Sequence, residues 1–305
     1  MQTFSKRLSP LENQVALVLG NFDGFHKGHM TLLEEAKRIS VEAGIQSAVF
    51  SFEPHPSFVL SHKEPVDLIN TRREKEMVFE LLGMDFYFEF PFTMELAALD
   101  PESFIKELLL KQVNPHTIVV GEDYHFGKKR QGNVDMLKVL GEKYNFKVSV
   151  LPKMMDEEKE ISSTWIRQLI KEGNIEKANF LIGRPFFITG MVRDGAKIGR
   201  TIGYPTANLT PDKEKLLPPF GVYVTKVTFD KREFYGMTNV GDRPTVETEG
   251  VIVETFIIDF DEEIYGTEIR VDFLNYIREE LKFDSLEELK CQIAKDVSHI
   301  GDYRD

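Results

Sequence analysis

Cysteine is almost absent from this sequence of 305 residues, which contains a single one, Cys291. One cysteine excludes an intrachain disulfide and a cysteine-based metal cluster, and it is typical of proteins from a reducing compartment. The sequence also lacks an apolar run near the roughly 20 residues that a membrane-spanning helix needs. Its N-terminus lacks the apolar core and cleavage site of a signal peptide. We therefore expect a cytoplasmic protein without a membrane segment.

Positive charge is also scarce, since 38 lysines and arginines against 50 aspartates and glutamates give a formal net charge of −12. Non-specific binding of nucleic acid needs a basic surplus that displaces counterions from the phosphates. We therefore expect no nucleic-acid partner, although a local cluster such as Lys128-Lys129-Arg130 can still contact a phosphate. The composition, 42% hydrophobic and 29% charged, is that of a globular protein, and the length favours two domains. Nothing in the sequence indicates an oligomeric state.

The most informative stretch of the sequence runs from Val15 to His29 and reads VALVLGNFDGFHKGH. Its apolar start predicts a buried parallel strand, a glycine-containing turn follows, and helical spacing of apolar residues begins at Met30. This order directs free backbone N–H groups and the positive end of a helix dipole at an anion such as a phosphate. His26 and His29 lie one helical turn apart, so both imidazoles can point at that anion.

The two histidines with Gly28 between them match the H-x-G-H signature of nucleotidylyltransferases. The longer string GNFDGFHKGH resembles the prokaryotic bifunctional riboflavin kinase/FAD synthetases. This resemblance implies that His26 and His29 are catalytic and that the turn around them binds the nucleotide. The turn residues to which it assigns this binding are Gly20, Phe22, Asp23, Gly24 and Gly28.

The rest of the first half alternates between strand and helix patterns. Strands are predicted at 46–52, 85–90, 116–121 and 147–151, and helices begin near Thr71 and Pro101. This alternation predicts a parallel sheet with helices on both faces, in which ligands bind at the carboxyl ends of the strands. We expect an α/β Rossmann-like nucleotidylyltransferase domain, the FMN adenylyltransferase domain of the family, over residues 1–182.

Two loops at this carboxyl edge resemble flavin-binding elements of the same family. The first contains Pro54-His55-Pro56, whose prolines force an extended conformation, and the resemblance implicates Pro56; a plain turn is the alternative. The second loop, GEDYHFGKKRQGN, resembles the family pattern G-x-[DN]-[FY]-x-F-G. That resemblance places Asp123 and Phe126 near the flavin, and a solvated charged loop is the alternative.

A further nucleotide-binding element is predicted at Ile161–Arg167, ISSTWIR, where a helix begins. Hydroxyl residues at a helix start are usually caps, but Arg167 lies one turn past Thr164 on the same face, which suits a triphosphate. The string resembles the S-S-[ST]-x-I-R motif that accompanies H-x-G-H in nucleotidylyltransferases. The resemblance assigns Ser163, Thr164 and Arg167 to the nucleotide.

Past Gly183 the helix patterns give way to short strands with turns, which predicts a separate antiparallel β domain over residues 183–305. Thr206 and Asn208 are two residues apart in an extended segment, so both point to one side, and neutral oxygens of this kind suit Mg²⁺. An ordinary turn is the alternative. The string GRTIGYPTANL closely resembles the riboflavin kinase signature. The resemblance assigns ATP to Gly195, Gly199, Arg200, Thr206 and Asn208, and Mg²⁺ to the last two.

The apolar segment 251–260 predicts a central strand buried on both faces. Glu254 interrupts this segment with a carboxylate. A buried carboxylate is paired, or its pKa rises through desolvation, so a salt bridge is one interpretation. In riboflavin kinases the matching glutamate is the base that deprotonates the ribityl 5′-hydroxyl. Phe256 and Asp194 stand where that family often has histidine, so some detail of the pocket differs.

The C-terminal segment is predicted to be helical over 275–281 and again from Ser285. Arg278 in the first helix is near the flavin by resemblance, and an apolar stripe from Leu286 to Val297 in the second is expected to pack on the core. The resemblance covers the whole chain and implies a small antiparallel β-barrel with a C-terminal helix after the α/β domain.

The function implied is ATP-dependent phosphorylation of riboflavin to FMN, followed by adenylylation of FMN to FAD with release of pyrophosphate. ATP is the co-substrate, and Mg²⁺ is the expected cofactor. Two alternatives are an FAD synthetase with a degenerate kinase half and a regulator that only binds flavin. A turnover assay that resolves FMN from FAD separates the three.

Overall fold

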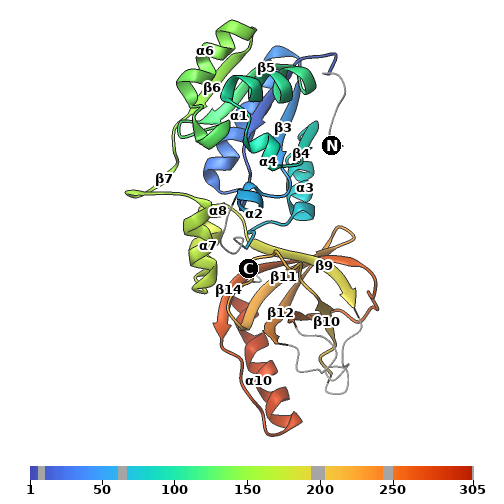
Figure 1. Ribbon diagram of the computed structural model, residues 1–305. Coiled ribbons are helices and arrows are strands. Elements are labelled where there is room, and N and C mark those ends of the chain that lie inside the picture. Colours follow the sequence, from blue (N-terminus) through green and yellow to red (C-terminus); the bar gives the residue numbers. More distant parts are fainter. Residues whose placement is uncertain (6–10, 61–66, 194–202, 243–249, 304–305) are drawn as a thin grey trace. The chain divides into compact units, whose positions relative to one another are not determined.

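The computed structural model describes residues 1–5, 11–60, 67–193, 203–242 and 250–303 (Figure 1). The chain divides by its contacts into two compact units, Met1–Ser163 and Thr164–Asp305. No helix among the described residues is long and apolar enough to cross a membrane.

The first unit is built on a parallel sheet in the order β1-β4-β3-β2-β5-β6. These strands are β1 (Gln2–Phe4), β2 (Val15–Leu19), β3 (Gln46–Phe52), β4 (Phe86–Phe90), β5 (Pro115–Gly121) and β6 (Lys147–Leu151). The helical segments are α1 (Lys27–Ala43), α2 (Pro56–Leu60), α3 (Arg72–Leu81), α4 (Met94–Ala97), α5 (Pro101–Phe104), the π-helix η1 (Ile105–Leu110), the 3-10 turn η2 (Lys128–Arg130) and α6 (Val134–Tyr144). A small hairpin of β7 (Met155–Asp156) and β8 (Lys159–Glu160) follows β6.

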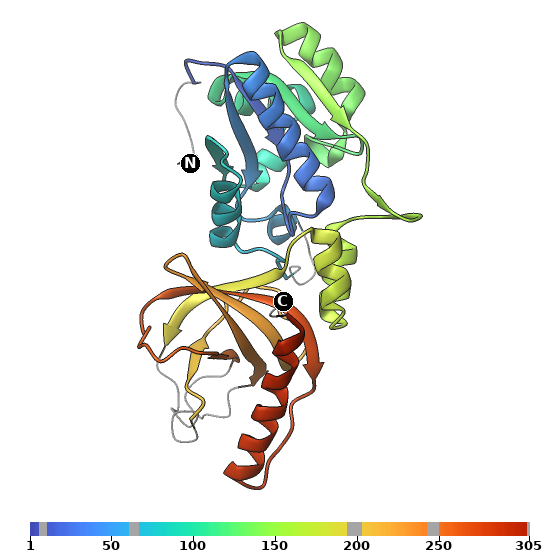
Figure 2. The ribbon, with the colours of Figure 1, turned by 180° about the vertical axis from the view of Figure 1, so that it is seen from behind.

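Helices cover both faces of this sheet, which Figures 1 and 2 view from opposite sides. Alternate strand residues such as Leu17, Phe50 and Phe88 join one core cluster with η1 and α6. Their neighbours along the strands point to the other face, where Tyr87 of β4 packs on Phe79 of α3. The predicted α/β fold is therefore confirmed, while β1 and the small hairpin were not predicted.

Local sequence signals set the helix starts as expected. Thr71 and Glu74 form a reciprocal capping box at the start of α3. Asp100 caps α5, with Pro101 in its first turn. The carboxyl ends of β2, β3 and β5 each lead into one of the loops that the sequence marked as functional.

The second unit contains two helices and a closed antiparallel barrel in the order β10-β13-β12-β11-β14-β9. The helices α7 (Ser163–Lys171) and α8 (Ile175–Ile182) come first. The strands are β9 (Phe186–Arg193), β10 (Thr206–Leu209), β11 (Gly221–Phe229), β12 (Arg232–Asp242), β13 (Val251–Ile257) and β14 (Glu268–Arg278). Helix α10 (Leu286–Ser298) and the 3-10 turn η3 (His299–Tyr303) follow.

The barrel interior contains a row of fully buried hydroxyl groups. Thr225 Oγ1 donates to the carbonyl oxygen of Gly236 and lies 2.8 Å from Thr238 Oγ1. Thr238 Oγ1 in turn lies 2.8 Å from Thr255 Oγ1. These side chains satisfy one another, so the barrel holds polar groups where water is excluded.

Two expectations about the second unit are wrong. The segment predicted as a helix at 275–281 continues β14, because Tyr276 and Arg278 pair with Tyr223 and Val222 of β11, and this pairing overrides the local pattern. Strand β13 is central, as predicted, but it is buried on one face only, since alternate residues are half-buried.

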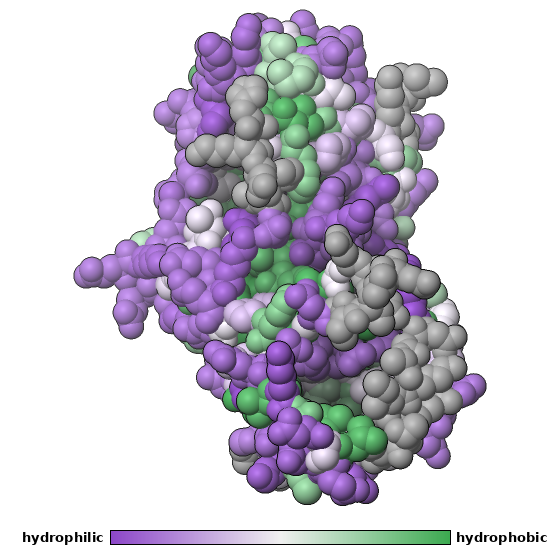
Figure 3. Space-filling model, turned by 60° about the horizontal axis from the view of Figure 1, so that its bottom comes forward, coloured by the Kyte–Doolittle hydropathy of each residue, from purple (hydrophilic) through white to green (hydrophobic). Residues whose placement is uncertain are grey.

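The apolar stripe of α10 is only partly buried. Val297 packs against the cluster around Val224 and Ile300, whereas Leu286 at the other end is 54% exposed. Figure 3 turns this end of the barrel unit forward and shows apolar residues at the surface among hydrophilic ones. The expectation that the whole stripe is core packing is therefore corrected.

Helix α8 is bonded to the barrel. The side chain of Asn179 donates to the carbonyl oxygen of Phe273 at 2.8 Å and accepts from the backbone N of Phe186 at 2.7 Å. The domain boundary at 182/183 places α8 with the first domain and stays a prediction.

We expect a fragment 164–305 to be more stable than a fragment 183–305, because only the longer one keeps α8. The two hydrogen bonds of Asn179 alone predict a difference of about 2 kcal/mol in the free energy of unfolding. Urea denaturation of both fragments measures it. Equal stabilities would show that α8 does not support the barrel.

Candidate functional site

The two histidines of the H-x-G-H motif stack on each other at the start of α1. Their ring centroids are 3.8 Å apart with an interplanar angle of 20°. His26 is the N-cap, and its Nδ1 accepts from the backbone N of His29 at 3.4 Å. A Cβ atom at position 28 would lie 3.2 Å from the His26 ring, so Gly28 permits this tight arrangement.

Burial lowers the pKa of His26 to about 4, against weaker attractions from Asp23 and Asp123 that raise it. The imidazole is therefore neutral near pH 7. Because Nδ1 accepts the helix N–H group, the ring proton is on Nε2, which is a hydrogen-bond donor. A neutral donor thus lies at the positive end of the α1 dipole.

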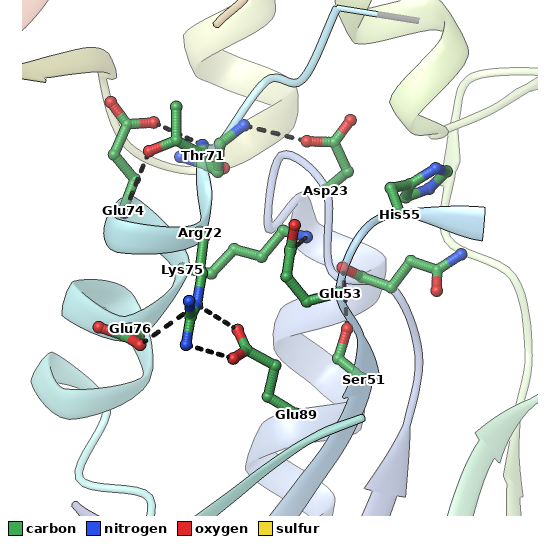
Figure 4. Close-up of polar contacts among 12 residues, drawn as sticks. Asp23, Ser51, Glu53, His55, Thr71, Arg72, Glu74, Lys75, Glu76 and Glu89 are labelled. Carbon is green, nitrogen blue, oxygen red and sulfur yellow. Dashed lines mark hydrogen bonds and ion pairs between the residues drawn. The ribbon is translucent and has the colours of Figure 1, made fainter. Parts of the chain in front are cut away.

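The turn that carries these histidines is held by hydrogen bonds from distant residues (Figure 4). Asp23 Oδ1 accepts from the backbone N of Asn70 at 3.0 Å, and Asn70 Oδ1 accepts from the backbone N of Gly24 at 3.1 Å. Ser163 Oγ donates to the carbonyl oxygen of Asp23 at 2.7 Å. Asn70 has this positioning role and was missed, because the sequence shows only that it precedes a helix cap.

Several turn residues assigned to the nucleotide make their contacts within the protein. Phe22 is fully buried, and its ring lies 5.2 Å from that of His29. A Cβ atom at Gly20 would lie 3.0 Å from the Phe22 ring, and one at Gly24, where φ is +90°, would lie 2.9 Å from Ile69. Nucleotide binding by Gly20, Phe22, Asp23 and Gly24 stays a prediction.

The residues assigned to the flavin follow strands next to β2. Pro56 is half-buried and begins α2 after β3. Asp123 follows β5, with its carboxylate 3.6 Å from Lys153 Nζ. Phe126 is buried and stacks with Tyr124, which leaves little of its ring for a ligand in this structure. Their contacts with flavin stay predictions.

The S-S-T-x-I-R motif falls where the two units divide. Ser163 is the last residue of the first unit, whereas Thr164 and Arg167 lie on the first turns of α7 in the second. Thr164 is exposed and Arg167 is half-buried. Their assignment to the nucleotide also stays a prediction.

In the barrel unit, strand register places three polar residues in one row. Glu254 of β13 pairs with Asn208 of β10 on one side and with Asn239 of β12 on the other. Thr206 occupies the next row, opposite Phe256. Asn239 was not singled out in the sequence, because its place beside Glu254 depends on strand register, which the sequence around it does not indicate.

Asn208 is 6% exposed, and its Oδ1 has no hydrogen-bond partner among the described residues. Its Nδ2 donates to the carbonyl oxygen of Thr206 at 3.3 Å. The side-chain oxygen is therefore an acceptor suited to a hard cation. A cavity of about 300 Å³ beside Thr206 is lined by apolar residues that include Val192, Ile257 and Phe260, and also by the acidic residues Asp261, Glu262 and Glu263.

Four other predicted site residues belong to the barrel unit. Gly195, Gly199 and Arg200 lie outside the described residues. Arg278 ends β14, where its guanidinium makes a bidentate pair with the buried Asp296 of α10, at 3.0 and 2.7 Å. The arginine thus anchors α10, and its contact with flavin stays a prediction. Within the described ranges, no cluster of three His, Cys, Asp or Glu residues could hold a metal ion.

Comparison with known families assigns a function to each half. The FAD synthetase family model matches residues 8–165, and the riboflavin kinase model matches residues 182–303. The bifunctional riboflavin kinase/FMN adenylyltransferase of Bacillus subtilis is 37% identical over 92% of this chain and 89% of its own length. The Escherichia coli K12 enzyme of the same name is 35% identical over 92% of this chain and 90% of its own length.

The chain belongs to the bifunctional riboflavin kinase/FMN adenylyltransferase family. It contains both the FAD synthetase domain and the riboflavin kinase domain, so the expectation of a bifunctional enzyme is confirmed. ATP and the flavins riboflavin, FMN and FAD are the small molecules that these activities imply.

The same fold occurs in a protein of a different name, a macrolide-efflux protein from Streptococcus pneumoniae. Its crystal structure covers 97% of this chain and 97% of its own, with a TM-score of 0.83 and 32% sequence identity. That name applies to the pneumococcal protein alone. The two proteins share their architecture over both halves of the chain.

We expect the stability of this family member to fall as pH drops from about 6.5 to about 4. Unfolded His26 takes up a proton near pH 6.5, whereas the folded form resists protonation down to its lowered pKa of about 4. The stability is complete above pH 6.5, and the loss is roughly 3 kcal/mol at pH 4. Urea denaturation at pH 7.5 and 4.5 should show a larger loss for the wild type than for His26→Asn. Equal losses would contradict a neutral buried His26.

Proposed function

We propose that this bifunctional enzyme adenylylates FMN at the start of α1 and phosphorylates riboflavin beside the row Asn208–Glu254–Asn239. The observation that carries the first assignment is the stacked histidine pair at a helix N-terminus, with a neutral Nε2–H donor on His26. Because both reactions consume ATP, we place them in the cytoplasm.

Adenylyl transfer in this scheme needs no general base. The FMN phosphate is largely ionised at pH 7, so its oxygen attacks the α-phosphorus of ATP directly while the bond to pyrophosphate breaks. The enzyme contributes position and charge stabilisation. His26 and His29 donate to oxygens of the α-phosphoryl group, and the N–H groups around Gly28 face the same charge.

The remaining residues of this site bind the two ends of the reactants. We assign the departing pyrophosphate to Ser163, Thr164 and Arg167, which offer hydroxyl and guanidinium donors. We assign the flavin to Pro56, Asp123 and Phe126, which follow strands next to the histidine turn. Gly20 and Gly24 allow the close packing that shapes this turn.

In the kinase reaction we assign the base to Glu254. It removes the proton of the ribityl 5′-hydroxyl, whose oxygen forms a bond to the γ-phosphorus as ADP departs. Its place between Asn208 and Asn239 supports this, since both neighbours are neutral and leave the carboxylate as the basic group of the row. We also assign Arg278 to the flavin, as the family resemblance implies, in addition to its pairing with Asp296 of α10.

The nucleotide of the kinase reaction is assigned to the neighbouring strand. The apolar part of the cavity beside Thr206 suits the face of an adenine ring, and the phosphates are assigned to Gly195, Gly199 and Arg200. Thr206 and Asn208 fit Mg²⁺, because Asn208 Oδ1 is a buried acceptor without a partner among the residues described. When bound, Mg²⁺ neutralises charge on the phosphates.

We expect His29→Ala to abolish most FAD formation and to leave FMN formation intact. Loss of one donor to charge that develops in the transition state typically lowers the rate about 10²–10³-fold. Separate assays with FMN plus ATP and with riboflavin plus ATP measure both activities on one preparation. FAD synthesis within a few-fold of wild type would overturn the assignment.

We expect Glu254→Gln to lower kcat of the kinase about 10²–10⁴-fold with little change in KM, because glutamine keeps the shape but cannot take a proton. FMN adenylylation should be unchanged. Glu233→Gln is the matched control, since Glu233 pairs with Lys226 at the surface of neighbouring β12. A lower melting temperature with normal kcat would instead mean that Glu254 is only a structural partner.

A further inference from the structure

Lys75 of α3 is a buried lysine that no part of the mechanism above uses. Its side chain is 0% exposed, and its Nζ lies 3.9 Å from Glu53 Oε2. The ammonium group has no hydrogen-bond partner among the residues that the structure describes. Burial of a charged group costs free energy unless the charge is paired, so the position of Lys75 depends on the carboxylate nearest to it.

The other polar groups on this face of the sheet do not provide a closer pair (Figure 4). Glu89 of β4 is bound by Arg72, at 2.6 and 2.9 Å. The hydroxyl of Tyr87 donates to the same carboxylate at 3.4 Å, and burial raises the pKa of Tyr87, so it stays neutral. Glu53 is therefore the carboxylate toward which Lys75 is directed.

Glu53 directly follows Phe52, the last residue of β3, and begins the flavin loop. Its backbone N donates to the carbonyl oxygen of Phe90 at 2.9 Å, which ties it to the end of β4. Pro54, His55 and Pro56 follow directly, and His55 Nδ1 lies 2.7 Å from Ser57 Oγ at the start of α2. The Glu53 side chain thus connects the first residue of this loop to α3.

The start of α3 holds the other loop of the site. Asn70 bonds to Asp23 and Gly24 in the histidine turn. Lys75 lies one helical turn further along, where its backbone N donates to the carbonyl oxygen of Thr71 at 2.9 Å. The segment from Asn70, just before the N-cap of α3, to Lys75 in its first turns therefore contacts the nucleotide turn at one end and the flavin loop at the other.

We propose that Lys75 is a positioning residue of the FMN adenylyltransferase site. Through Glu53 it fixes the start of the flavin loop relative to the histidine turn that the same segment holds. This spacing determines how tightly FMN binds beside the histidine turn. The inference rests on the proposed binding of flavin at Pro56.

The test is Lys75→Met in the full-length enzyme, which keeps the chain length and removes the charge. We expect KM for FMN to rise about tenfold or more, because a displaced flavin loop loses contacts that bind FMN equally in the ground state and the transition state. KM for ATP in FAD synthesis and both kinase constants should stay within twofold of wild type. The double variant Glu53→Gln/Lys75→Met should recover part of the loss, because it leaves no unpaired charge.

Lys37→Met is the matched control. Lys37 Nζ donates to the carbonyl oxygen of Leu82 at 2.6 Å, so this variant loosens the far end of α3 without touching either loop. We expect it to leave KM for FMN unchanged.

A normal KM for FMN in Lys75→Met would overturn the proposal, whether or not the melting temperature or the apparent kcat falls. If Lys75→Met does not fold, Glu53→Gln alone must raise KM for FMN, and a normal value there would overturn the proposal equally. Failure of the proposed function is distinguishable, because His29→Ala would then synthesise FAD at the wild-type rate whatever Lys75→Met does.

Discussion

The adenylylation site depends on the removal of one imidazole from water. Burial keeps His26 neutral, the backbone N–H of His29 occupies its Nδ1, and the remaining nitrogen is left as a fixed donor. A charged ring stacked 3.8 Å from its neighbour would attract anions more strongly but would lack this defined tautomer. The packing of Phe22 against the His29 ring and the absence of a side chain at Gly28 both serve this arrangement.

Both halves of the enzyme use the same principle, in which strands of a rigid sheet place short polar segments beside one another. In the first unit the strands are parallel, so the loops after β2, β3 and β5 meet at one edge. In the barrel the strands are antiparallel, and cross-strand register aligns Asn208, Glu254 and Asn239 instead. The site in one case depends on where strands end, and in the other on how they pair.

Local signals were predictable from the sequence, and long-range pairing was not. The helix start near Thr71 and the order of strand, glycine turn and helix from Val15 onward depend on neighbours in the chain, and both were predicted. The segment around Arg278 was expected to be a helix but is a strand, because its backbone pairs with β11. Lys75 lies in the charged string RREKE, which is typical of a solvated helix face; only the sheet against α3 shows that it is buried.

The hydroxyl row inside the barrel has a direction. Thr225 donates its single hydroxyl proton to the carbonyl oxygen of Gly236, so Thr238 must donate to Thr225, and Thr255 must donate to Thr238. Each rotor is thereby set by the next, from β13 through β12 to β11. Removing the middle hydroxyl would take away both the acceptor of Thr255 and the donor to Thr225. The directional chain of hydroxyl hydrogen bonds thus couples the three strands in addition to their backbone hydrogen bonds. Loss of one hydroxyl would change the hydrogen bonding of all three strands.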